Sequence, residues 1–523
     1  MSWLWFIPVL LVMVVIHEMG HFLTARLFGM KVHEFGIGFP PKVWSKKTKD
    51  GMEWSINALP IGGFVRIEGE NGDSNDPNAF GTKPTWQRAI VLIAGPLMNM
   101  ILAFVLYLIL AVGGRDVPKG NVAVVDVVPN SPAATYGMEI GDIFLYVGDK
   151  KIQSTRDVSI ETTLNKAEPI HFIMERKGQR VDLTIKPRLK PPEGEGALGI
   201  KLGYLVTGQD IVAAKPDPKL GFNLGFQEGD QLTAVDGLPI VNNAFLKKYI
   251  ENSDKDSVAV TLLRNGQQLV QTVTLRSYVD IIYKGSDAEK AGLPGGALIK
   301  NIGLDGGSNF TTIYNSKEYD AFMQANQGRK VQINYTEIDP NGDEVPGKVF
   351  ITANLSSDPS VANRSPRLST VGVFTKNLFV HESFDLFGMV NDASYQTWNA
   401  VTLIPRSFNA IFNGSVPVSS LAGPVGMAQI TGQVVDNGGL ITLVTLTALL
   451  SVNLGVMNIL PLPALDGGRL IFVLIEMLTR GKRVPPEKEG LVHLVGMVAL
   501  LSLMVIISLG DIIRLISGTG FSS

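Results

Sequence analysis

The chain has 523 residues, 45% of them hydrophobic, and a formal net charge of −2 at pH 7. This length is too great for one domain, and the near-neutral charge gives no sign of a nucleic-acid-binding surface. Because cysteine is absent, disulfides, thiolate ligands and cysteine nucleophiles are excluded, so any metal site must use histidine and carboxylate side chains. A membrane protein that carries soluble modules fits this composition best.

An apolar run at residues 3–16 leads into a His-Glu-x-x-His motif formed by His17, Glu18 and His21. On a helix, two histidines four residues apart project from one face, so both can bind one metal ion while Glu18 activates a metal-bound water. The motif also occurs by accident on solvated helices. Each ionisable group costs about 2.5–3.5 kcal/mol in a membrane helix unless it meets a partner or a cavity. We therefore interpret the motif as a metal site in or near a membrane.

The first apolar run also differs from a secretory signal peptide. No basic residue precedes it, and the metal motif stands where a cleavage site would lie. We expect this segment to remain in the mature protein.

Three later stretches also lack charged residues: 89–114, 437–465 and 490–510. Each has the roughly 20 residues that a spanning helix requires, so four transmembrane helices are predicted. Basic residues occur in the connections that follow the first and third spans: Arg26, Lys31, Lys42, Lys46, Lys47, Lys49, Lys83 and Arg88, then Arg469, Arg480, Lys482, Arg483 and Lys488. The positive-inside rule makes both connections cytoplasmic, which leaves both termini and the region from about 115 to 436 outside.

The region between the second and third spans has the pattern of small β domains. Short alternating runs, such as residues 122–128 and 258–263, predict strands bounded by turns. A weak internal repeat consists of three Gly-x-x-x-Gly cores that begin at Gly137, Gly225 and Gly292. A short capped helix, a glycine turn and a strand with a hairpin resemble the bacterial PDZ domain, which binds a peptide strand at a sheet edge. The third copy resembles it least, and domains that bind no ligand remain the alternative for each copy.

Two histidines leave a zinc ion underligated, so a third protein ligand is needed, with a fourth position left for water. Asp466 is the strongest candidate because it directly follows a charge-free span. Pro461 and Pro463 break helical hydrogen bonding there, which is tolerated at membrane depth only where the backbone is buried or lines a cavity. We interpret Asp466 as a carboxylate on a distorted helix end beside a wet pocket. A solvated carboxylate at the cytoplasmic interface is the alternative.

Together these motifs resemble the site-2 protease family of intramembrane zinc metalloproteases, and within it the regulator-of-sigma-E protease group with its PDZ-like insertion. The segments that carry the resemblance are residues 17–21, 95–99 and 458–468. It implies that His17, His21 and Asp466 bind Zn²⁺ and that Glu18 is the general base. It also implies hydrolysis of a peptide bond within the transmembrane segment of a membrane protein, in regulated intramembrane proteolysis such as release of an anti-sigma factor domain. Three PDZ-like repeats depart from the one or two expected for the group.

The same resemblance suggests residues that contact substrate. Gly62, Gly63 and Phe64 lie in a stretch similar to the family's membrane-associated β-hairpin, whose edge would pair with an unwound substrate. Asn453 and Asn458 are polar residues of the third span that can hydrogen-bond substrate, or can instead join helices. The expected partners are single-span membrane proteins, such as anti-sigma-factor-like proteins and signal-peptide remnants, peptide tails at the PDZ-like domains and the lipid bilayer. No nucleic-acid partner is expected.

The expected fold class is a multi-pass α-helical membrane protein with four transmembrane helices and a membrane-associated β-hairpin, plus extracytoplasmic α+β PDZ-like domains. It is expected in the bacterial cytoplasmic (inner) membrane. The expected segments are 1–114 (two spans, zinc motif and hairpin), 115–190, 191–277 and 278–357 (PDZ-like domains 1 to 3), 358–436 (linker and amphipathic membrane-surface segment) and 437–523 (third and fourth spans).

Two other functions are alternatives to the protease. A non-catalytic PDZ membrane scaffold would hold a structural zinc ion with four protein ligands, whereas the sequence offers three. A transporter also has polar residues at membrane depth, but four spans without detectable inverted repeats argue against it.

Overall fold

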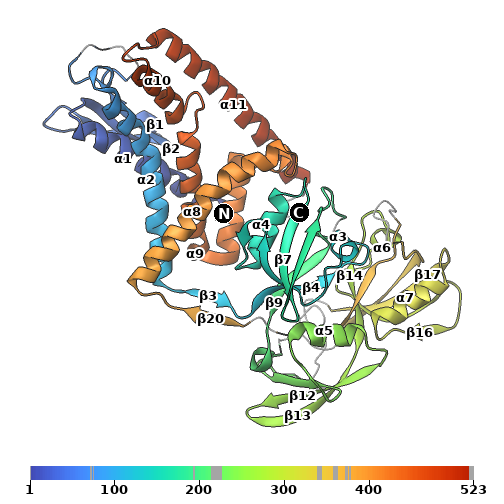
Figure 1. The fold of residues 1–523 in the computed structure, drawn as a ribbon. Coiled ribbons are helices and arrows are strands. Elements are labelled where there is room, and N and C mark those ends of the chain that lie inside the picture. Colours follow the sequence, from blue (N-terminus) through green and yellow to red (C-terminus); the bar gives the residue numbers. More distant parts are fainter. Residues whose placement is uncertain are drawn as a thin grey trace. The chain divides into compact units, whose positions relative to one another are not determined.

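The computed structural model describes residues 2–70, 74, 76–192, 195–213, 226–338, 344–356, 363–371, 375 and 378–517. The chain divides into two compact units, shown in Figure 1. A helical unit comprises Met1–Arg115 and His381–Ser523, and a β unit comprises Asp116–Val380.

Among the described residues, four helices of the helical unit are long and apolar enough to cross a bilayer, the same number as the spans expected. They are α1 (Phe6–Leu27) with the preceding η1 (Ser2–Trp5), α2 (Thr85–Val112), α9 (Pro424–Ile459) and α11 (Pro486–Ser517). The third differs from its predicted range of 437–465. It begins earlier, is broken at Gly439, and ends at Ile459 because Pro461 and Pro463 cannot donate backbone hydrogen bonds.

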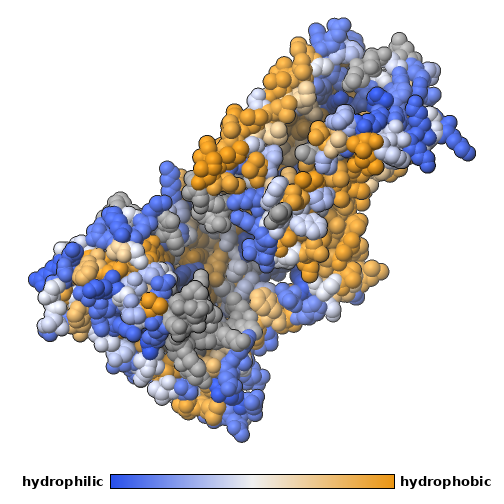
Figure 2. All heavy atoms as spheres, turned by 180° about the vertical axis from the view of Figure 1, so that it is seen from behind, coloured by the Kyte–Doolittle hydropathy of each residue, from blue (hydrophilic) through white to orange (hydrophobic). Residues whose placement is uncertain are grey.

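Small residues let these helices approach closely. A side chain at Gly20 of α1 would lie 2.3 Å from the backbone oxygen of Ala94 in α2. A side chain at Gly455 of α9 would lie 2.8 Å from the oxygen of Pro96. In lipid, where water does not drive helices together, such close contact is a main source of attraction. On the face that Figure 2 shows, apolar side chains cover the middle of the helical unit and hydrophilic ones gather at one end.

A long antiparallel hairpin follows α1. Its strands are β1 (Val32–Lys47) and β2 (Glu53–Ile67), and the short η2 (Phe80–Thr82) precedes α2. β2 lies against α1, because a side chain at Gly63 would be 3.6 Å from both Val14 and Glu18. The hairpin inferred from the sequence is therefore present and reaches the metal motif.

The predicted amphipathic segment forms α8 (Leu386–Phe412). Its alanines at 393 and 400 are buried in one apolar cluster with residues of α2 and α9, whereas Phe387 and Trp398 are exposed. The remaining elements of the helical unit are η5 (Val418–Ser420) and α10 (Asp466–Leu478). Strands β3 (Arg115–Pro118) and β20 (Phe379–Glu382), where the chain passes between the units, pair with each other.

A buried carboxylate attaches α11 to the start of α9. Asp511 is fully buried, and its Oδ2 accepts hydrogen bonds from the backbone N–H groups of Gly423 (2.9 Å) and Gly426 (2.8 Å). The first amides of a helix have no partner within the helix, and a carboxylate there also interacts favourably with the helix dipole. Asp511 thus acts as an N-cap supplied by another helix.

The described residues of the β unit form three sheets, each with its own apolar core. The first comprises β4 (Asn121–Val127), β5 (Ile143–Val147), β6 (Lys150–Lys151), β7 (Ile170–Arg176), β8 (Gln179–Ile185) and β9 (Ile200–Leu205), with α3 (Pro132–Thr135) and α4 (Thr155–Leu164). The second comprises β10 (Gln231–Val235), β11 (Leu238–Pro239), β12 (Ser257–Arg264) and β13 (Gln267–Thr274), with η3 (Gly208–Asp210) and α5 (Asn243–Glu251). The third comprises β14 (Arg276–Ile281), β15 (Leu298–Leu304), β16 (Phe310–Thr312), β17 (Lys330–Ile338), β18 (Glu344–Thr352) and β19 (Arg367–Val371), with α6 (Asp287–Lys290) and α7 (Ser316–Ala325).

The predicted domain boundaries at residues 190, 277 and 357 differ from these sheets. β9 pairs with β4, and β19 pairs with β14, so the first and third sheets each close with a strand that lies beyond its predicted end. Such pairing joins residues far apart in the sequence, which local alternation does not reveal. The boundary at 277 falls inside β14.

The repeated glycine turns share a backbone conformation. The second glycine of each core, at 141, 229 and 296, has a positive φ of +95°, +96° and +85°. In the first two copies an aspartate follows and accepts a hydrogen bond from the N–H three residues earlier. Asp142 also pairs with Arg176, and Asp230 pairs with Arg264. The third copy lacks this aspartate, as the sequence indicated; Gly225, which begins the second core, lies outside the described residues.

We expect Asp230→Asn to destabilise the second β domain. Hydrogen bonds from Arg264 hold the pKa of the Asp230 carboxyl below its ordinary value. Because the unfolded chain takes up the proton more readily, the stabilisation is complete above about pH 4 and is lost as the pH falls through the lowered pKa. At pH 7 the substitution should lower the free energy of unfolding by about 1.5–3 kcal/mol, and it should weaken the acid dependence.

Chemical denaturation of the full chain in detergent, followed by circular dichroism at several pH values, tests this expectation. Asp254→Asn is the matched control, because the Asp254 side chain is 88% exposed in its ion pair with Lys317. Equal denaturation midpoints for the two variants at pH 7 would contradict the assigned role of Asp230.

Candidate metal centre

The three predicted ligands converge, although α1 and α10 are separated by more than 400 residues. His17 Nε2 lies 3.0 Å from Asp466 Oδ2, and His21 Nε2 lies 3.4 Å from the same oxygen. The two imidazole nitrogens are 3.2 Å apart. In the part of the chain that the structure describes, this is the one group of histidine and carboxylate side chains close enough to share a metal ion.

The geometry fits zinc. Zinc bonds of about 2.0–2.1 Å at tetrahedral angles place neighbouring ligand atoms about 3.3 Å apart, close to the three separations above. Both histidines are buried, and Asp466 Oδ2 is shielded from solvent without accepting a hydrogen bond from the described residues. A buried oxygen without a donor is costly unless a cation satisfies it. Three protein ligands leave a fourth position open, as in catalytic zinc sites.

Helix α2 orients the two imidazoles. His21 Nδ1 lies 2.8 Å from the backbone oxygen of Val91, to which it donates, and this leaves Nε2 unprotonated for a metal. The Asn99 amide lies 3.2 Å from His17 Nδ1. Asn99 Oδ1 has no other partner among the described residues, and an amide turned so that this oxygen accepts the Nδ1 proton frees His17 Nε2 in the same way. A side chain at Gly95 would come within 2.3 Å of His21 Nε2, so only glycine leaves room for both rings.

Asp466 is placed by a non-helical turn. Ala464, two residues earlier, has a φ of +73°, and its N–H donates to His493 Nδ1 over 2.9 Å. Asp466 then begins α10, where unpaired amides and the helix dipole favour a carboxylate. The expected distorted helix end is therefore wrong in one respect: Asp466 starts a new helix instead of ending α9.

Glu18 lies on the hairpin side of the site. Its Cγ lies 3.6 Å from where a side chain at Gly63 of β2 would be, and Glu18 follows His17 directly on α1. This position next to the ligands, and outside the ligand set, is the one that a general base requires.

The predicted substrate-contact residues occupy two places. Gly62, Gly63 and Phe64 lie in β2, and Gly63 lies next to Glu18. Asn453 and Asn458 lie in the last turns of α9; Asn453 is exposed, Asn458 is half-buried, and neither amide pairs with another described residue. The sequence analysis gives Asn99 and His493 no individual role. For Asn99, a polar side chain within a charge-free span is the feature that could have indicated one.

We expect zinc binding to depend on each of the three ligands. Purified protein should contain about one zinc ion per chain, and His21→Ala or Asp466→Ala should lose most of it, because two ligands hold zinc weakly. Metal analysis by mass spectrometry measures this. His171→Ala is the control, since this exposed histidine pairs with Asp182 in the β unit. Retention of zinc by Asp466→Ala at the control level would show that Asp466 is not a ligand.

Comparisons with known proteins show the family to which the chain belongs. The family model described as peptidase family M50 matches residues 5–503. The regulator of sigma E protease of Haemophilus influenzae is 26% identical and aligns over 98% of this chain and all of its own length. The zinc metalloprotease RasP of Shouchella clausii is 28% identical over 98% of this chain and 99% of its own. The metalloprotease MmpA of Caulobacter vibrioides is 35% identical over 38% of this chain and 55% of its own. The chain therefore belongs to peptidase family M50 and is a zinc metalloprotease of the membrane.

Proposed function

We propose that the protein is an endopeptidase that cuts a peptide bond within the transmembrane segment of a single-span membrane protein. The observation that carries this proposal is the position of the ligand set: His17 and His21 lie inside an apolar helix that is long enough to span a bilayer. A substrate that reaches a site in such a helix comes from the membrane. A structural zinc would need a fourth protein ligand, and the group of described residues contains three.

Different residues of the site bind the metal, transfer the proton and orient the ligands. Zinc, when bound by His17, His21 and Asp466, supplies a Lewis acid that polarises a carbonyl and makes a bound water acidic near neutral pH. Glu18, next to these ligands, takes the proton from the attacking water and passes it to the leaving amine. The backbone oxygen of Val91 and the Asn99 amide hold the imidazoles in place, so that reaction requires little reorganisation.

The hairpin supplies a place for an extended substrate. A peptide bond in a helix is shielded by its own hydrogen bonds, so the substrate has to unwind, and in lipid its freed backbone groups need new partners. The segment of β2 at Gly62, Gly63 and Phe64 lies beside Glu18 and can pair with such a strand. The unpaired amides of Asn453 and Asn458 are suited to hydrogen-bond the same backbone.

The orientation follows from charge. Basic residues gather in the hairpin connection and in the connection between α10 and α11, which supports a cytoplasmic position for both connections in the bacterial inner membrane. Both termini and the β unit then lie outside.

The three β domains are PDZ-like, and they act as a size filter that admits substrates whose outer domain has been trimmed. The shared order of capped helix, glycine turn, strand and hairpin in the first and third domains supports the PDZ likeness. One relative is named a regulator of sigma E protease, which supports anti-sigma-factor-like proteins as substrates. Signal-peptide remnants have the same single-span form, and peptide tails are the ligands proposed for the domains themselves.

Glu18→Gln should abolish cleavage and leave zinc in place. The amide keeps the shape of the side chain but cannot accept the proton, so cleavage of a single-span substrate should fall by about 10²–10⁴-fold. Purified variants in detergent or liposomes, assayed for cleavage and zinc content together, measure both effects. The exposed Glu487→Gln serves as control. If Glu18→Gln cleaves the substrate at the rate of the control, Glu18 is not the general base.

The filter is tested by replacing residues 119–378 with a short Gly-Ser linker. The Lys119 N–H lies 2.7 Å from the Leu378 oxygen, so the ends to be joined are already adjacent. The intact protein should cleave trimmed substrate much faster than full-length substrate, and the shortened protein should cleave both at similar rates. An unchanged preference in a shortened protein that still cleaves trimmed substrate would reject the filter.

A further inference from the structure

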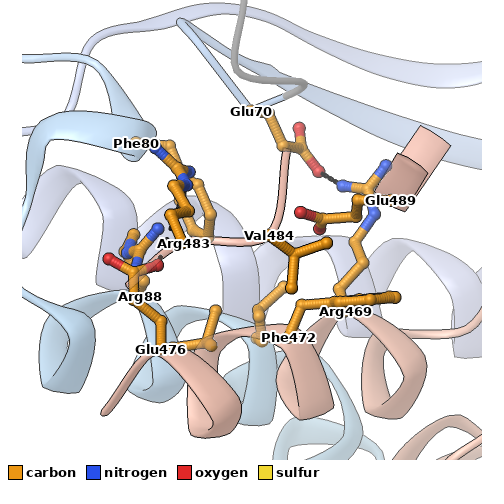
Figure 3. A pocket seen from close by; sticks show the side chains of 11 residues that line it. Glu70, Phe80, Arg88, Arg469, Phe472, Glu476, Arg483, Val484 and Glu489 are labelled. Carbon is orange, nitrogen blue, oxygen red and sulfur yellow. Dashed lines mark hydrogen bonds and ion pairs between the residues drawn. The ribbon is translucent and has the colours of Figure 1, made fainter. Parts of the chain in front are cut away.

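Six charged side chains of both signs meet around a small cavity between α2, α10 and the beginning of α11 (Figure 3). They are Glu70, Arg88, Arg469, Glu476, Arg483 and Glu489. The cavity volume of 20 Å³ has room for about one water molecule, so the cluster is not a ligand pocket. Its equal numbers of carboxylates and guanidinium groups indicate that it joins the surrounding segments.

Arg88 is the centre of this cluster. It belongs to the first turn of α2 and is only 1% exposed, and its Nη2 lies 2.5 Å from Glu476 Oε2. Phe80 covers the guanidinium with its ring centroid 6.0 Å away. A guanidinium excluded from water requires a carboxylate in a fixed position, so this ion pair is directional. Arg483 lies farther from Glu476, at 3.7 Å, and is more exposed.

Two ion pairs of this cluster hold α10, one near each end of the helix. Glu476 lies in the last turns of this helix, and Arg469, in its first turn, pairs with Glu70 just after the hairpin. Asp466 is the first residue of the same helix, and the N-cap residue before it, Leu465, makes no side-chain capping hydrogen bond. Because a short helix moves as a rigid rod, the two ion pairs act together with the turn at Ala464 to set where the Asp466 carboxylate lies.

One face of α2 contacts both histidines of the metal site and the helix that carries Asp466. Positions 88, 91, 95 and 99 are separated by three or four residues, so they share one side of a helix. Val91 and Asn99 contact the two histidines, Gly95 makes room for them, and Arg88 reaches α10. The two histidines and the carboxylate are therefore aligned to the same rigid element.

We propose that Arg88 is a positioning residue of the zinc site, which acts through Glu476 to set the tilt of α10 and hence the place of Asp466. This inference rests on the proposed function only in taking the three ligands as a zinc site. Ten residues of helix separate Asp466 from Glu476, about 15 Å at 1.5 Å per residue. A tilt of about 4° would then move Asp466 by roughly 1 Å, whereas zinc ligands tolerate about 0.2 Å.

The test measures zinc binding without substrate, by competition with a chelator, on the full-length protein. Glu476→Gln leaves Arg88 without its charge partner and should weaken zinc binding by about 10- to 100-fold, as the loss of supporting partners does at other zinc sites. Glu487→Gln makes the same chemical change on an exposed carboxylate nearby and should bind zinc like the unmodified chain. Equal zinc affinity in these two variants would overturn the proposal.

A second variant separates positioning from folding. Arg88→Met combined with Glu476→Leu replaces the ion pair by apolar side chains, which at buried sites often keeps or raises stability. The proposal expects a chain with an unchanged melting temperature that still binds zinc more weakly, and a Co²⁺-loaded form with an altered visible spectrum, because that spectrum reports ligand geometry. Zinc affinity equal to that of the unmodified chain would refute it. Normal zinc binding without peptide cleavage in the unmodified chain would refute the proposed function and leave this inference standing.

Discussion

Polar groups enclosed by apolar helices have to be paired with one another, because neither lipid nor water is there to satisfy them. The metal site obeys this constraint at each step. His21 is held by a backbone oxygen and His17 by an amide, and Asp466 sits at a helix start where free amides favour its charge. The three ligand atoms then face one another, 3.0 to 3.4 Å apart. The fold therefore leaves these three atoms available to a cation.

Helix α2 supplies most of the partners that these polar groups need. α2 contributes no ligand, yet its Val91 oxygen, Asn99 amide and Arg88 guanidinium reach α1 on one side and α10 on the other. Close approach of the backbones makes this possible: α1 contacts α2 through Gly20, and α9 contacts it through Gly455. A helix that aligns ligands without providing any is easily overlooked when a site is defined by its ligands alone.

How much the sequence could predict depends on how local each signal was. The His17-to-His21 spacing and the charge-free runs are local, so the metal motif and the number of spans followed directly. The prolines before Asp466 identify it as a candidate ligand, because a carboxylate there needs a partner. They do not reveal that this residue starts a new helix. The closing strands β9 and β19 and the Arg88–Glu476 pair join segments far apart in the chain, and composition and periodicity carry no record of such pairings.

The attachment of α11 bears on the order in which this protein is made. Asp511 satisfies amides that precede it by 88 and 85 residues, so the start of α9 has left the ribosome long before its cap is synthesised. Until then those N–H groups must bond to water or to headgroups at the bilayer surface. Helix α11 thus supplies the acceptor that lets the first amides of α9 leave their aqueous partners.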